Sequence, residues 1–175
     1  MLRPRADVET HLVISTAGRA TIRYETGYTV QDVRRLADVA YGDNDLGAAI
    51  SSGSFRTAGM LIAPTSVKTL SAVANSFGDH LIARAADVCL KERRRPVVLL
   101  LRETPLHAGH IRLMGECTNA GAIVMPPVPA FYALPQTLDD VIDHTVQRAL
   151  DQFDLAPPET ARWDGDRSTE GAAAR

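Results

Sequence analysis

The apolar stretch at residues 96–101, PVVLLL, constrains the fold more than any other part of the sequence. It has the length of a single strand, and no polar side chain marks one of its faces as exposed to solvent. Strands of this kind are typical of parallel sheets, because helices cover such sheets on both faces. The rest of the chain is therefore expected to supply parallel neighbouring strands and the helices that cover them.

Alternating strand and helix patterns support this expectation. Strands are expected at residues 8–15, 39–41, 60–63, 96–101 and 122–125. Helices are expected at residues 16–25, 29–37, 67–76, 81–94, 107–119 and 138–153. Because strands alternate with helices, the sequence predicts an α/β fold with a doubly wound parallel sheet.

The size of the chain suits one domain. It has 175 residues, of which 45% are hydrophobic, and this is enough for one substantial core. We expect a single domain over residues 1–155 and a loose polar tail over residues 156–175. Trp163 is the only residue expected to anchor this tail.

The composition argues against several classes of protein. A net charge of −2 gives no sign of a surface that binds nucleic acid. No apolar run approaches the roughly 20 residues that a membrane helix needs, and the first residues lack the apolar part of a signal peptide. Cys89 and Cys117 form no CxxC pair, so we expect reduced thiols. These features predict a cytoplasmic protein that binds neither nucleic acid nor a membrane.

The turn at residues 65–69, TSVKT, follows an expected strand and begins an expected helix. Doubly wound sheets bind ligands at this end of their strands, and a helix N-terminus offers free N–H groups to an anion. The hydroxyls and Lys68 add further donors to a phosphate. On this stretch alone, simple capping of the helix by Ser66 is the favoured alternative. Ser15 begins another helix in the same way, and capping is favoured there too.

Charged residues follow the apolar strand and line one helix. Arg102 and Glu103 form either a structural ion pair, or an arginine for phosphate beside a carboxylate for proton transfer. Arg84, Asp87 and Lys91 share one helix face, for which a solvated surface is the favoured interpretation.

Aromatic and histidine side chains give weaker signals. Phe131 and Tyr132 lie in a loop with four prolines, where they either plug the core or form a wall for a flat ligand. His107 and His110 have no further ligands at metal-binding spacing, and we expect no metal site.

The chain resembles the UbiX-type flavin prenyltransferases in six stretches that occur in the family's order. These are VETHLVIS, AISSGSF, LIARAADVCLKERR, LRETPLH, GAIVMPPVPAFY and TLDDVIDHTVQRALDQF. The resemblance extends from about residue 7 to Gly165. One component of the bacterial aryl-acid decarboxylases belongs to the same family.

The resemblance implies a flavodoxin-like, Rossmann-like subunit that binds FMN and assembles as a homo-oligomer, usually a dodecamer. It implies transfer of a dimethylallyl group from dimethylallyl phosphate to reduced FMN, at flavin N5 and C6, without a metal. The product, prenylated FMN, is the cofactor of UbiD-type decarboxylases, which act in ubiquinone synthesis or aromatic-acid metabolism.

The resemblance also implies roles for individual residues. Those that match FMN contacts are Ser15, Ser66, Val67, Lys68, Thr69 and Arg102. Those that match contacts to the prenyl phosphate are Tyr132 and Arg148. Those that match catalytic positions are Glu25, Arg84, Lys91 and Glu103, and Trp163 matches an aromatic that covers the site. These residue types suit the reaction, because cations stabilise a departing phosphate and a carboxylate can pass protons to it.

One part of the family pattern has no counterpart in the chain. Family members begin with a strand and a Gly-Ala-Ser-Gly turn, whereas Met1-Leu2-Arg3 matches the end of the helix that follows. Because that strand is central in the sheet, its loss is expected to expose two strand edges, to impair folding and to weaken FMN binding. We expect a start codon assigned too far downstream, or else a remnant that has lost activity.

Two other functions stay open from the sequence. One is an inactive or accessory subunit of an aromatic-acid decarboxylase, which would bind flavin without turnover. The other is a direct flavin-dependent carboxy-lyase, which would release carbon dioxide without a partner enzyme.

Overall fold

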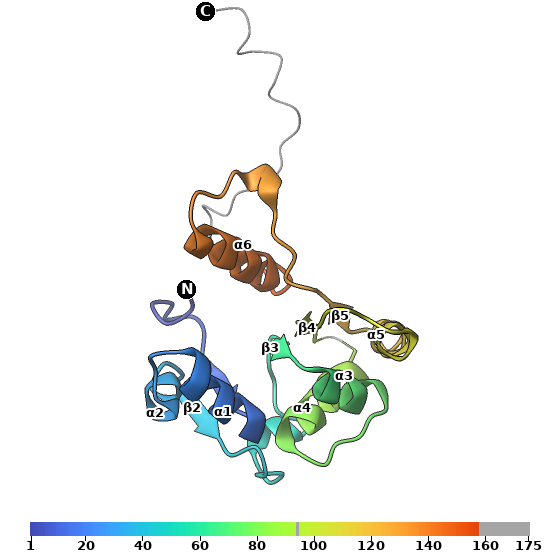
Figure 1. The fold of residues 1–175 in the computed structure, drawn as a ribbon. Coiled ribbons are helices and arrows are strands. Elements are labelled where there is room, and N and C mark those ends of the chain that lie inside the picture. Colours follow the sequence, from blue (N-terminus) through green and yellow to red (C-terminus); the bar gives the residue numbers. More distant parts are fainter. Residues whose placement is uncertain (94, 158–175) are drawn as a thin grey trace, which may run out of the picture. The chain divides into compact units, whose positions relative to one another are not determined.

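The computed structural model describes residues 1–93 and 95–157 (Figure 1). Its strands are β1 (His11–Val13), β2 (Val39–Tyr41), β3 (Met60–Thr65), β4 (Val97–Leu101) and β5 (Ile123–Val124). Its helices are α1 (Thr16–Glu25), α2 (Val30–Arg34), α3 (Val67–Ala74), α4 (Leu81–Lys91), α5 (Ala108–Asn119) and α6 (Leu138–Asp151). Two short 3-10 helices are η1 (Ala49–Ser51) and η2 (Phe131–Ala133). The predicted alternation of strands and helices is therefore confirmed.

The contacts group the chain into two compact units, Met1–Pro127 and Val128–Arg175. The first unit contains all five strands, and the second contains η2 and α6. A single domain over residues 1–155 stays a prediction. Trp163 and most of the expected tail lie outside the described residues.

Every strand pair in the described structure is parallel, as the apolar stretch predicted, but the strands form two sheets instead of one. One sheet has the order β3-β4-β5, with β4 in the centre, and the other consists of β1 and β2. β1 and β3 each have one edge that pairs with no strand of the described residues. β2 and β5, the other outer strands, also have one unpaired edge each among the described residues.

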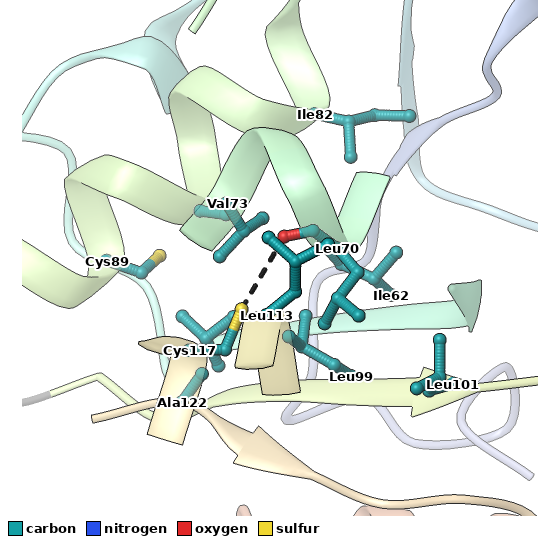
Figure 2. Packing of buried hydrophobic residues seen from close by; sticks show 12 residues of the cluster. Ile62, Leu70, Val73, Ile82, Cys89, Leu99, Leu101, Leu113, Cys117 and Ala122 are labelled. Atoms are coloured by element: carbon teal, nitrogen blue, oxygen red, sulfur yellow. Dashed lines mark hydrogen bonds between the residues drawn. The ribbon is translucent and has the colours of Figure 1, made fainter. Parts of the chain in front are cut away.

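The core lies around β4. All five residues of this strand are buried, and Leu99 has no exposed surface. Figure 2 shows how side chains from α3, α4 and α5 meet β3 and β4 in one cluster. Val13 of β1 packs against this cluster, so the two-stranded sheet shares part of the same core.

Both cysteines are free and buried in this core. The Cys117 thiol donates to the backbone oxygen of Leu70 over 3.6 Å (Figure 2). Burial raises the pKa of Cys117 to about 11, with a smaller contribution from the neighbouring Glu116 carboxylate. Burial also raises the pKa of Cys89. Both thiols are therefore held in their protonated form at neutral pH.

All described α-helices except α4 begin at a residue whose side chain caps them. The hydroxyl of Thr29 accepts from the backbone N–H of Asp32, and the Asp32 carboxylate accepts from the N–H of Thr29 in return. Thr137 and Asp140 form the same capping box at the start of α6. Backbone N–H donors around this box lower the pKa of Asp140. None of the described helices is long and apolar enough to cross a membrane.

Candidate functional site

The turn between β3 and α3 has the capped geometry that the sequence predicted. Ser66 is the N-cap of α3, and its hydroxyl accepts from the backbone N–H of Thr69 at 3.2 Å. Val67 and Lys68 begin the helix, and Lys68 is exposed. The Thr65 side chain is buried and donates to the oxygen of Ile62 at 2.8 Å. Capping and anion binding are compatible here, because one cap leaves other N–H groups of the first turn unpaired.

The pairing of β3 with β4 brings the backbone of Arg102 close to this turn. Its backbone N–H donates to the oxygen of Thr65 at 3.3 Å, so the carboxyl ends of β3 and β4 meet. Glu103 accepts from the backbone N–H of Thr104 at 3.0 Å. The ion pair between Arg102 and Glu103, one of the two sequence alternatives, is absent from the described structure. Both side chains are exposed, so they remain open to a ligand.

The start of α1 repeats the capped arrangement in the two-stranded sheet. The hydroxyl of Ser15 accepts from the N–H of Gly18 at 3.0 Å. Glu25 ends the same helix and is exposed. No residue of α1 is buried, so this part of the candidate site is supported by little packing.

The charged face of α4 carries two more candidate residues. Arg84 lies 3.5 Å from Asp87, and Lys91 lies 3.7 Å from Glu92. The Arg84 and Lys91 side chains are 42% and 52% exposed, which agrees with a solvated face. A solvated face leaves both cations accessible to an anion.

Lys91 and Arg102 lie toward opposite ends of β4. Arg102 directly follows this strand, whereas Lys91 lies near Gly53, to which Arg95, just before the strand, is hydrogen-bonded. A strand of this length spans about 16 Å. One copy of the chain therefore does not bring Lys91 and Arg102 together at the same end of the sheet.

Tyr132 and Arg148 belong to the second unit. The ring of Tyr132 in η2 meets the ring of His144 edge-on, with centroids 5.9 Å apart. Arg148, in the last turn of α6, donates to Asp151 at 2.6 Å. Trp163, the expected cover of the site, lies outside the described residues.

The histidine pair has a local structural role. The ring centroids of His107 and His110 lie 3.7 Å apart. Nδ1 of His107 accepts a hydrogen bond from the backbone N–H of Gly109 at the start of α5. Within residues 1–93 and 95–157, no cluster of three or more metal-ligating side chains occurs.

Sequence reasoning missed one long-range contact beside Lys91. The side chain of Arg95 donates to the backbone oxygen of Gly53 at 3.2 Å, across 42 positions of the chain. The sequence shows Gly53 only as part of a turn-rich SSGS segment and Arg95 only as part of a short basic run. No local pattern links the two.

Comparisons with known proteins assign the chain to a family. Residues 2–150 match the family model described as Flavoprotein. The chain is 56% identical, over 98% of its length, to the flavin prenyltransferase UbiX of Thauera aromatica, of which it covers 88%. The chain belongs to the UbiX family of flavin prenyltransferases. A second UbiX relative, from Escherichia coli strain K12, is also 56% identical, over 94% of this chain and 88% of its own length.

Solved UbiX structures have the same fold. A crystal structure of AnUbiX (PadA1) in complex with FMN and dimethylallyl pyrophosphate matches with a TM-score of 0.89 and 52% identity, over 93% of this chain and 86% of that one. A dodecameric FMN-dependent UbiX-like decarboxylase from Escherichia coli O157:H7 matches with a TM-score of 0.89 and 48% identity, over 94% of this chain and 88% of that one. The flavodoxin-like fold expected from the resemblance is confirmed.

Proposed function

We propose that the protein is a flavin prenyltransferase that transfers a dimethylallyl group from dimethylallyl phosphate to reduced FMN. The observation that carries this proposal is the identity of more than half of the residues to UbiX enzymes over nearly the whole chain. The match to a UbiX structure described with FMN and dimethylallyl pyrophosphate supports it.

The carboxyl ends of β3 and β4 fit the FMN phosphate. Ser66, Val67, Lys68 and Thr69 form the first turn of α3, where free N–H groups and the helix dipole favour an anion. Lys68 and Arg102 have no ion-pair partner among the described side chains, so both cations are available to a phosphate. Ser15 adds a hydroxyl from the start of α1.

The remaining candidates act on the prenyl phosphate. When bound, reduced FMN supplies the nucleophilic N5 and C6 atoms that accept the dimethylallyl group. Arg84, Lys91 and Arg148 stabilise the departing phosphate, because the electron pair of the breaking C–O bond moves onto the phosphate oxygen and cations bind this added negative charge. Glu103 passes a proton to or from this phosphate, and Tyr132 is a hydrogen-bond partner for it. Glu25 is a further catalytic position of this proposal.

The homo-oligomer has a specific role in this proposal. Because Lys91 and Arg102 lie toward opposite ends of β4, they can act on neighbouring groups only if they come from different copies of the chain. Mixing two inactive variants, Lys91→Gln and Arg102→Gln, should restore part of the activity, since mixed assemblies contain some intact sites. No recovery on mixing would argue against a site shared between copies.

Turnover is the decisive test of the function. Protein, reduced FMN and dimethylallyl phosphate are incubated without oxygen, and prenylated FMN is detected by mass spectrometry. We expect Arg102→Gln to weaken FMN binding about 10- to 100-fold, because it removes a charged partner of the phosphate. Arg112→Gln, on the exposed face of α5, is the matched control and should leave FMN binding unchanged.

Other outcomes of this assay identify the other functions. Bound flavin without turnover would indicate an accessory or inactive subunit. Release of carbon dioxide from an aromatic acid without a second enzyme would indicate a carboxy-lyase. The proposal also includes a cytoplasmic location for the protein and the delivery of prenylated FMN to a UbiD-type decarboxylase. Recovery of that decarboxylase's activity on addition of the product would test the delivery.

A further inference from the structure

The SSGS loop at residues 51–54 packs against the end of α4. The hydroxyls of Ser52 and Ser54 lie 2.9 Å apart and brace the loop. The hydrogen bond from Arg95 to the oxygen of Gly53 fastens it to the segment that leads into β4. The loop is therefore braced internally and tied to the segment before β4 by one hydrogen bond.

A side chain at Gly53 would compete for space with Glu92 and Lys91. A Cβ atom built at this position would overlap the carboxylate of Glu92 and lie 3.2 Å from Nζ of Lys91. The backbone of Gly53 does not adopt a positive φ, in contrast to Gly59 and Gly121. A side chain at position 53 would therefore displace the ends of the Glu92 and Lys91 side chains, and it would not meet the strain of a left-handed backbone.

The space above Gly53 holds a charged pair. The Glu92 carboxylate fills it, and Lys91 lies 3.7 Å from this carboxylate. Lysine has a long flexible side chain, and a solvated ammonium group on such a chain has many conformations of similar energy. A neighbouring carboxylate favours those conformations in which the ammonium lies close to it.

We propose that Gly53 is a positioning residue for Lys91. By lacking a side chain, Gly53 admits the Glu92 carboxylate, and this carboxylate keeps the Lys91 ammonium beside the SSGS loop. The role of the positioned ammonium rests on the proposed function, in which Lys91 stabilises the departing phosphate. The positioning itself depends only on the three residues and is testable without flavin or substrate.

The test uses the fact that Lys68 and Lys91 are the only lysines of the chain. Lysine is labelled with ¹³C, and the Cε signals of the two residues are followed by NMR. Gly53→Ala should displace Glu92 and shift the Lys91 signal, while the Lys68 signal stays in place. Gly42→Ala is the matched control, because a Cβ at Gly42 meets nothing within 4 Å. It should move neither signal.

A second substitution separates positioning from a general packing defect. Aspartate is one methylene shorter than glutamate, so Glu92→Asp withdraws the carboxylate from the new methyl group. Combined with Gly53→Ala, it should return the Lys91 signal toward its original position. An unmoved Lys91 signal in Gly53→Ala, equal shifts of both lysines, or no recovery in the double variant would each overturn the proposal.

A charge variant keeps the test decisive if Gly53→Ala does not fold. Glu92→Gln keeps the shape of the side chain and removes its charge, so it should also shift the Lys91 signal. Glu116→Gln, at an exposed position of α5, should not. If Gly53→Ala does not fold, a Lys91 signal that Glu92→Gln leaves unmoved contradicts the proposal.

Kinetics then connect positioning to the reaction. We expect Gly53→Ala to raise KM for dimethylallyl phosphate about fivefold with a smaller change in KM for FMN, because only the prenyl phosphate uses Lys91. Glu92→Asp should recover part of this loss. If the unmodified protein gives no turnover, the proposed function fails, but the NMR result still decides whether Gly53 positions Lys91.

Discussion

The three-stranded sheet and the two-stranded sheet differ sharply in how much support they receive. In the first, β4 has a strand on each side and every one of its residues is buried. In the second, all residues of β1 and β2 are only partly buried. Helix α4 buries most of its residues, whereas α1 buries none. The strand with neighbours at both edges is therefore buried far more completely than the strands with a single neighbour in the two-stranded sheet.

This difference divides the candidate site. Ser66, Lys68 and Arg102 lie just after strands of the well-packed three-stranded sheet. We therefore expect these residues to keep a fixed geometry. Ser15 and Glu25 stand on α1, which has few packing contacts to hold it. We therefore expect the candidate residues on the three-stranded sheet to be better ordered than the candidate residues on α1.

Equal truncations in the two sheets should have the most unequal effects on stability. Leu99→Ala in β4 should lower the free energy of unfolding by about 2–5 kcal/mol, because it leaves a cavity in a fully buried site. Leu12→Ala in β1 should cost less than about 1.5 kcal/mol, because the side chain is partly exposed. Chemical denaturation of both variants measures the difference. Similar losses would show that the two sheets are equally well supported.

Hydrogen exchange should reveal the same contrast without mutation. We expect paired amides of β4 to exchange at least about 100-fold more slowly than those of β1, a difference of about 2.7 kcal/mol in opening free energy. The physical reason is the free edge of β1, from which local opening can start. Exchange measured by NMR or mass spectrometry gives both values in one experiment. Equal protection would mean that the free edges of β1 and β3 are covered.

The sequence predicted those features of the fold that depend on local chemistry. The stretch PVVLLL identified the buried strand β4, and the hydroxyls of Ser66 and Ser15 identified the caps of α3 and α1. The expected strand at residues 8–15 was too long, because β2 offers only three residues for pairing. Pairing with β2 therefore defines only the short strand His11–Val13.

Features that depend on distant parts of the chain could not be predicted. The bond between Arg95 and Gly53 joins segments that only the folded chain brings together. The separation of Lys91 from Arg102 by the length of β4 likewise depends on where α4 ends relative to the sheet. The family resemblance named both cations, but it did not reveal that one chain keeps them apart.

The pH dependence of stability should report on the well-packed sheet. The pKa of Cys117 is raised to about 11 in the folded protein, so the folded state holds this proton more tightly than the unfolded state. The stabilisation is fully present below the unfolded pKa and is lost as the pH rises toward 11. Between about pH 8.5 and 10.5, the free energy of unfolding should fall by about 1–2 kcal/mol.

Denaturation at several pH values checks this expectation. Cys117→Ala should remove most of the decrease, although a smaller slope from Cys89, whose pKa is also raised, should remain. An unchanged slope in Cys117→Ala would mean that the Cys117 thiol is not held in its protonated form by burial.

The smallest expected effect comes from removing one helix cap in each region. Ser66→Ala removes the cap of α3, whose packed residues belong to the core, and should lower global stability by about 1 kcal/mol. Ser15→Ala removes the equivalent cap of α1 and should lower it by less than about 0.5 kcal/mol, because α1 can fray without opening the core. Denaturation without flavin measures both, since each serine is also a proposed ligand contact. Ser66→Asp keeps a capping oxygen and should retain most of the stability, whereas equal losses in the two alanine variants would show that α1 unfolds together with the core.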